Sequence, residues 1–143
     1  MAKPTFPDRL AADLASRLEQ RFGSFPLIEG WGLTITALNP GLATLRIEAT
    51  PRTTNPSGGF INGGVLASLA DMASAVALCT AFDGQMPFVT ADLAIRYLEP
   101  ALGAVEAEAQ VVRLSSRSAV ISCELRCKGD TAALCTSHFT LKL

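Results

Sequence analysis

The 143-residue sequence has almost no net charge, because 12 basic side chains face 13 acidic ones. A nucleic-acid-binding protein normally has a basic excess or a basic stripe, and this chain has neither. Its glycines and prolines follow no repeating period, which excludes collagen-like and low-complexity classes. With 49 % hydrophobic residues, the chain is too apolar to be intrinsically disordered. Length and composition therefore predict one globular domain over residues 1–143.

Several catalytic signatures are also missing. The sequence contains no Gly-x-Ser-x-Gly elbow, no P-loop and no dinucleotide fingerprint. No His, Cys and Glu residues cluster with metal-ligand spacing, so we expect neither a metal nor a redox cofactor. The single histidine, His138, lies in a strand-like segment without a motif, and we expect it to be structural.

The four cysteines form no Cys-x-x-Cys pair, and each lies within an apolar stretch: Cys79, Cys123, Cys127 and Cys135. Residues 1–22 carry charges throughout and lack the apolar core of a signal peptide. We therefore expect a reduced, cytoplasmic protein in which the cysteines act as small core hydrophobes.

Hydrophobic periodicity predicts one amphipathic helix and about six strands. Residues 8–22 place a leucine or phenylalanine at every fourth position from Leu10 to Phe22, which is typical of a helix, and Gly23 is a suitable C-cap. Apolar and polar residues then alternate, as in strands with one buried face. The alternating segments are 33–37, 43–49, 88–98, 104–113, 117–127 and 131–142.

Between the second and third strands, residues 65–82 form an 18-residue apolar run. This length approaches that of a membrane span. Asp71 and six alanines inside the run instead favour a helix packed in protein. A helix that is apolar all round must be covered on most sides. The pattern predicts an α+β domain in which a curved antiparallel sheet wraps one long central helix, with the 8–22 helix in addition.

The start of this helix has features suited to binding a carbonyl oxygen. Asn62 is a favourable N-cap, which is its simplest interpretation. Gly63 and Gly64 have no Cβ, so a ligand can approach the backbone closely. Free N–H groups and the positive end of the helix dipole would stabilise negative charge developing on that oxygen.

Asp71 is the only charged residue between Arg52 and Asp83, and its neighbours one helical turn away are mostly small. It is either a structural carboxylate hydrogen-bonded inside the fold, or a general base or nucleophile. Eight residues separate it from Gly63, which is about 12 Å along a helix. If both groups act on one substrate, Asp71 must come from a second copy of the chain.

The order of these residues matches a known pattern. The matching positions are Asn55, Asn62-Gly63-Gly64, Asp71, and Thr90-x-Asp92-x-x-x-Arg96-Tyr97-Leu98-x-Pro100. Over residues 28–142 the chain resembles the PaaI-like acyl-CoA thioesterases of the hotdog fold, in the 4-hydroxybenzoyl-CoA thioesterase superfamily. The resemblance implies that Asp71 is the catalytic carboxylate and that the Gly63 amide polarises the thioester carbonyl. It further implies catalytic roles for Asn55 and Thr90, and substrate binding by Asn62, Gly64, Arg113, Ser116 and Arg117.

Two departures from the family pattern are visible. Asn62 stands where the family has histidine, and Asn55 lies one residue further from the glycines than usual. Either the loop bulges at Gly58-Gly59, or Asn62 takes over the polar role of Asn55.

The resemblance implies hydrolysis of a small to medium acyl-CoA by a homodimer or homotetramer with interface active sites, and no nucleic-acid or membrane partner. The alternative is a non-catalytic protein that binds acyl-CoA or aromatic ligands. We expect apolar walls for the acyl group, from Phe60, Ile61, Met72, Phe82, Met86 and Phe88.

Overall fold

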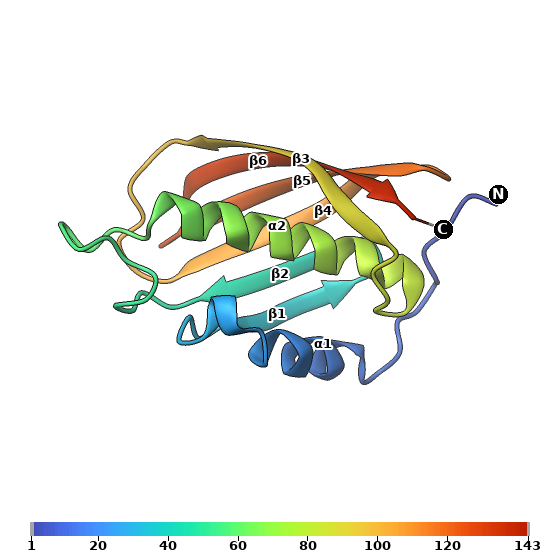
Figure 1. Ribbon diagram of the computed structural model, residues 1–143, viewed down its shortest axis with the longest axis horizontal. Helices are drawn as coiled ribbons and strands as arrows, with labels where there is room; N and C mark the ends of the chain where they lie inside the picture. Colours follow the sequence, from blue (N-terminus) through green and yellow to red (C-terminus); the bar gives the residue numbers. More distant parts are fainter. Residues whose placement is uncertain (1, 143) are drawn as a thin grey trace.

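The computed structural model describes residues 2–142, which form a six-stranded antiparallel sheet in the order β1-β2-β4-β5-β6-β3. The sheet curves around a central helix, α2 (Figure 1). This is the predicted α+β architecture. The strands are β1 (Thr34–Asn39), β2 (Leu42–Ile47), β3 (Phe88–Tyr97), β4 (Val105–Leu114), β5 (Ser118–Cys127) and β6 (Asp130–Leu141).

Tight turns at two hairpins set the strand register. The β1–β2 turn ends at Gly41, which has a φ of 75°. The β5–β6 turn places Lys128 and Gly129 at φ values of 52° and 84°, the left-handed conformations that a two-residue hairpin favours.

Helix α2 (Gly63–Cys79) continues into a short 3-10 helix, η2 (Thr80–Phe82). Together they are long and apolar enough to cross a membrane, but 67 % of the residues in the most apolar window are buried inside the protein. Helix α2 packs against β2, β4 and β5, as Figure 1 shows. The prediction of a core helix is confirmed.

The N-terminal helix is shorter than predicted. Helix α1 spans Leu14–Gly23, not residues 8–22, and its C-cap is Ser24, not Gly23. A turn in which the Leu14 amide donates to the Ala11 carbonyl precedes it. Leu10 packs against the core from this non-helical segment. The spacing of leucines therefore identified the buried face correctly but placed the first turn too early. A second 3-10 helix, η1 (Pro26–Ile28), follows.

The two edges of the sheet differ. Helix α1 packs along β1 (Figure 1). There, a carboxylate oxygen of Glu19 accepts a hydrogen bond of 2.6 Å from the Ile35 amide. At the opposite edge, most side chains of β3 are exposed, including Val89 at 45 % and Tyr97 at 49 %. The protein therefore has one protected edge and one open edge.

All four cysteines are free and buried, as expected. Burial raises the pKa of the Cys79 and Cys123 thiols to about 12. The pKa of Cys135 rises to about 11, mainly through burial and further through the negative charge of Asp71. These thiols are therefore protonated and act as small apolar groups at neutral pH.

Candidate active site

The first turn of α2 is capped so that one amide stays free. Asn62 Oδ1 accepts hydrogen bonds from the Gly64 and Val65 amides, at 2.8 and 3.3 Å. The Asn62 carbonyl accepts the Leu66 amide at 3.0 Å. Of the first four N–H groups of the helix, only that of Gly63 has no acceptor within residues 2–142. The predicted cap thus leaves a single donor at the positive end of the helix dipole.

The loop before α2 brings Asn55 to this cap. The Asn62 Nδ2 group donates to Asn55 Oδ1 at 2.8 Å. Gly58 and Gly59, with φ values of 95° and 71°, lie in the turn that is closed by the bond from the Asn55 amide to the Phe60 carbonyl. The Asn55 side chain therefore lies beside the start of α2.

Thr53 anchors the same loop from inside the protein. Its side chain is fully buried, and its hydroxyl donates to the Glu48 carbonyl and accepts from the Thr50 amide, both at 2.8 Å. Its own carbonyl accepts the Asn62 amide at 2.8 Å. Hydrogen bonds to both the main chain and the side chain of Asn62 thus fix this capping residue.

Asp71 and Thr90 form a second polar pair, in the middle of α2. Thr90 Oγ1 donates to Asp71 Oδ1 at 2.7 Å, and Asp71 is half-buried. Strict alternation along β3 would place Thr90 on the opposite face from Tyr97, yet both side chains contact α2. A bulge between Thr90 and Asp92 shifts the alternation and explains this arrangement.

Beyond its first turn, α2 has one partly exposed side within the described residues, the side around Asp71. Most residues of the helix are buried, whereas one stripe of small side chains is partly exposed. These residues are Gly64, Ala67, Ser68, Asp71 and Ala75. In one chain, Asp71 and the Gly63 amide remain about 12 Å apart along the helix axis. The structure thus presents two half-sites on one helix.

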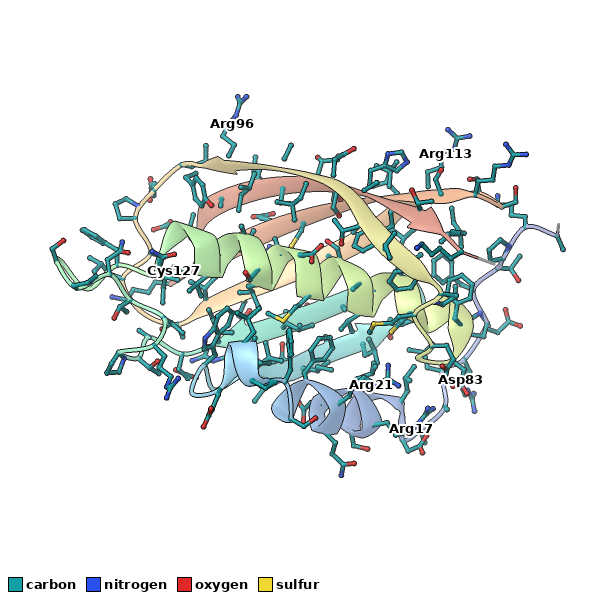
Figure 2. The ribbon with its side chains drawn as sticks, in the orientation of Figure 1. Arg17, Arg21, Asp83, Arg96, Arg113 and Cys127 are labelled. Atoms are coloured by element: carbon teal, nitrogen blue, oxygen red, sulfur yellow. The ribbon has the colours of Figure 1, made fainter. Side chains whose placement is uncertain are left out.

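The remaining predicted site residues lie at the other end of the molecule. Ser116 and Arg117 belong to the turn between β4 and β5, at the end of the sheet where α2 finishes (Figure 1). Arg113 points away from α2, as Figure 2 shows. His138, which was expected to be structural and not a site residue, lies in β6 with Nδ1 at 3.7 Å from Asp92 Oδ2. One chain does not bring these residues to Gly63.

No role for Tyr97 was predicted from the sequence, although the residue lies in the Arg96-Tyr97-Leu98-x-Pro100 motif. Its hydroxyl donates to the Gly63 carbonyl at 2.6 Å. Two fully buried hydroxyls, those of Ser74 and Ser137, were also not predicted, and they have no hydrogen-bond partner within residues 2–142. No pattern in the sequence marks these hydroxyls. The same described residues contain no group of three or more His, Cys, Asp or Glu side chains that could hold a metal ion.

Comparison with known proteins identifies the class of protein. Residues 58–134 match the model of the thioesterase superfamily. This segment contains α2, its cap and β3 to β5, and it covers more than half of the chain. The protein belongs to the thioesterase superfamily, has the hotdog fold and is a hydrolase of the thioesterase type.

Individual relatives agree with this assignment. The curated protein "Putative esterase VNG_1336C" of Halobacterium salinarum is 31 % identical over 126 residues, covering 85 % of this chain and 83 % of its own. A mutant of the phenylacetic acid degradation protein PaaI from Thermus thermophilus is 33 % identical, with a TM-score of 0.72, covering 81 % of this chain and 98 % of that chain. A Haemophilus influenzae thioesterase shares the fold at 19 % identity, with a TM-score of 0.81 over 96 % of this chain and 97 % of that chain.

Proposed function

We propose that the protein hydrolyses small to medium acyl-CoA thioesters to the free acid and CoA, at sites that each combine residues of two copies. One observation supports this most directly. The free Gly63 amide and the Asp71–Thr90 pair lie on the same helix but about 12 Å apart, so neither half-site is sufficient alone. Two antiparallel copies of α2, placed side by side, would complete two identical sites.

The open edge at β3 supports this pairing. A ten-residue exposed edge strand presents unpaired backbone groups that favour pairing with another strand. If β3 of one copy pairs antiparallel with β3 of the other, the twofold axis also relates the two α2 helices. The stripe of small residues around Asp71 allows their close approach. We propose a homodimer built in this way, or a homotetramer of two such dimers.

In this arrangement the Gly63 amide donates to the thioester carbonyl oxygen and stabilises the charge that develops on it. Asp71 of the other copy either removes a proton from the attacking water or attacks the carbonyl carbon itself, forming an anhydride that water then hydrolyses. In both routes the carbon–sulfur bond breaks and CoA leaves as the thiolate. Thr90 holds Asp71, while Asn55 and Asn62 hold the first turn of α2.

The turn that contains Ser116 and Arg117 fits a role in binding the CoA phosphates. It lies at the end of the sheet where α2 finishes (Figure 1). Antiparallel helices would bring that end toward the start of α2 in the other copy. An arginine can pair with a phosphate in two parallel hydrogen bonds. We assign this role to Arg117, with Arg113, Ser116 and Gly64 as further contacts. The four buried thiols fit a reducing compartment, which supports a cytoplasmic location.

The test is replacement of Asp71 by Asn, followed by thiol release from hexanoyl-CoA. General-base or nucleophilic catalysis predicts a fall in kcat of at least about 100-fold. The matched control is Asp8→Asn, an exposed carboxylate in the N-terminal segment, which should keep the wild-type rate. Undiminished turnover by Asp71→Asn would remove the mechanism. Wild-type protein that binds S-hexyl-CoA but releases no CoA from hexanoyl-CoA would favour the non-catalytic binding protein.

A further inference from the structure

An apolar hollow of about 350 Å³ opens directly beside Gly63. It lies between the segment that enters α2 and the segment that leaves β3. Gly63 and Tyr97 form part of its wall. The apolar residues that line it are Phe60, Ile61, Leu66, Leu98, Pro100 and Ala101. Of the acyl-group walls expected from the sequence, only Phe60 and Ile61 belong to it; Phe82 and Phe88 pack together 6.1 Å apart beyond the other end of α2.

Apart from the Gly63 amide, the N–H groups of this wall for which a bond is found already have acceptors within the protein. The Ile61 amide donates to the Ala101 carbonyl, and the Leu98 and Glu99 amides donate to the Ala132 carbonyl. The Gly63 carbonyl accepts the Tyr97 hydroxyl. The pantetheine arm of CoA carries two amides that need partners when they leave water, and an acyl chain carries none. The occupied wall therefore suits an acyl chain better than the pantetheine arm.

The charge of the lining also restricts which chemical groups this hollow can bind. The lining contains one charged side chain, Glu99, and no basic one. A phosphate or carboxylate placed there would meet a like charge without a compensating cation. Leu98, which is 50 % exposed, leaves apolar surface that an apolar ligand would cover.

We infer that this hollow holds the acyl group of the substrate, and that Glu99 selects uncharged acyl groups over acyl groups that end in a carboxylate. The inference rests on the proposed function and specifies its substrate class. With the carbonyl oxygen at the Gly63 amide, the acyl chain lies over Leu98 and Leu66, while sulfur and the rest of CoA extend away from the hollow.

The test compares kcat/KM for acetyl-, hexanoyl-, phenylacetyl- and succinyl-CoA. We expect hexanoyl- and phenylacetyl-CoA to exceed succinyl-CoA by at least about tenfold, because a terminal carboxylate near Glu99 is repelled. Glu99→Gln should narrow the hexanoyl-to-succinyl ratio by at least about threefold. Leu98→Ala should lower hexanoyl-CoA turnover by about three- to tenfold and acetyl-CoA turnover much less. The matched control is Glu29→Gln, an exposed glutamate outside the hollow, which should leave the ratio unchanged.

Equal use of succinyl- and hexanoyl-CoA by the wild-type protein would overturn the inference. So would an equal loss for every substrate in Leu98→Ala, because that would place the CoA arm in the hollow. Binding of the stable thioethers S-hexyl-CoA and S-(3-carboxypropyl)-CoA separates this inference from the proposed function. Suppose that S-hexyl-CoA binds selectively, that this binding depends on Leu98 and Glu99, and that no acyl-CoA is hydrolysed. This result would contradict the proposed function but would still support the hollow as the binding site for the acyl group. Equal binding of both thioethers would contradict the inference that the hollow binds uncharged acyl groups selectively.

Discussion

Thr90 Oγ1 donates a hydrogen bond to Asp71 Oδ1 at 2.7 Å, linking the open edge strand β3 to the middle of helix α2. The second oxygen of the carboxylate, Oδ2, accepts no hydrogen bond from residues 2–142, so it is available to a water molecule or a substrate. The hydrogen bond to Oδ1 thus orients the Asp71 carboxylate, and Oδ2 is left free to contact water or substrate. This geometry supports Asp71 as the reacting carboxylate of the proposed thioesterase.

Replacement of Thr90 by Val should remove this hydrogen bond with little change in shape. A hydrogen bond to a charged group is worth about 1.5–3 kcal/mol, so we expect kcat to fall by roughly 10- to 100-fold, with a much smaller change in KM. Thr90→Ser keeps a hydroxyl and should retain most of the activity. Steady-state kinetics with hexanoyl-CoA measure both variants. Equal activity of the Val and Ser variants would show that the hydrogen bond does not position Asp71.

Loss of the helix cap should mainly affect stability. Asn62→Ala removes the oxygen that accepts the Gly64 and Val65 amides. We expect the free energy of unfolding to fall by about 1 kcal/mol, measured by urea denaturation. Asn62→Asp keeps a capping oxygen and should lose much less. If the two variants were equally destabilised, the bond from Asn62 to Asn55, and not the cap, would be the stabilising contact.

The buried thiols predict a loss of stability at high pH. Burial raises the thiol pKa from 9.0 to about 12 in Cys79 and Cys123, and to about 11 in Cys135. Above pH 9 the unfolded chain releases these protons while the folded protein keeps them, so stability falls as pH rises through this window. Each thiol contributes a slope of about 1.4 kcal/mol per pH unit.

Urea denaturation at pH 8, 9 and 10 measures this dependence. Cys79→Ala should be less stable at every pH because of the cavity, but its stability should depend less steeply on pH than that of the wild-type protein. An unchanged slope would mean that Cys79 does not remain protonated in the folded state.

Local patterns in the sequence predicted most of the fold, because each strand has one apolar face and α2 is apolar throughout. The cap at Asn62 was also predictable, since it depends only on residues within one helical turn. The start of α1 was not, because the leucine spacing does not distinguish a helical first turn from a segment that packs Leu10 by another route.

The arrangement of side chains around Asp71 could not be predicted from the sequence. Alternation along β3 places Thr90 opposite Tyr97, and only the bulge before Asp92 turns both toward α2. A bulge depends on pairing between β3 and β6, which are distant in the sequence. The hollow beside Gly63 was missed for the same reason, because it joins residues before α2 to residues after β3.

Gly63→Pro offers a selective way to delete the proposed carbonyl-binding donor. Gly63 is the first residue of α2, a position that tolerates proline because its N–H makes no bond within the helix. Asn62 already has the extended conformation that precedes proline, with ψ of 139°. A Cβ added at residue 63 would lie 3.4 Å from the Tyr97 ring, an ordinary contact. We expect kcat to fall by about 100- to 1000-fold, whereas Gly63→Ala keeps the amide and should lose far less.

The most direct measurement combines Gly63→Pro and Asp71→Asn in one heterodimer, with a different affinity tag on each chain so that the mixed species can be purified. Both homodimers should be nearly inactive. If each site takes Gly63 from one copy and Asp71 from the other, the heterodimer contains one site with both defects and one intact site. It should then have about half of the wild-type activity per dimer. A heterodimer as inactive as its two parents would contradict a site shared between two copies.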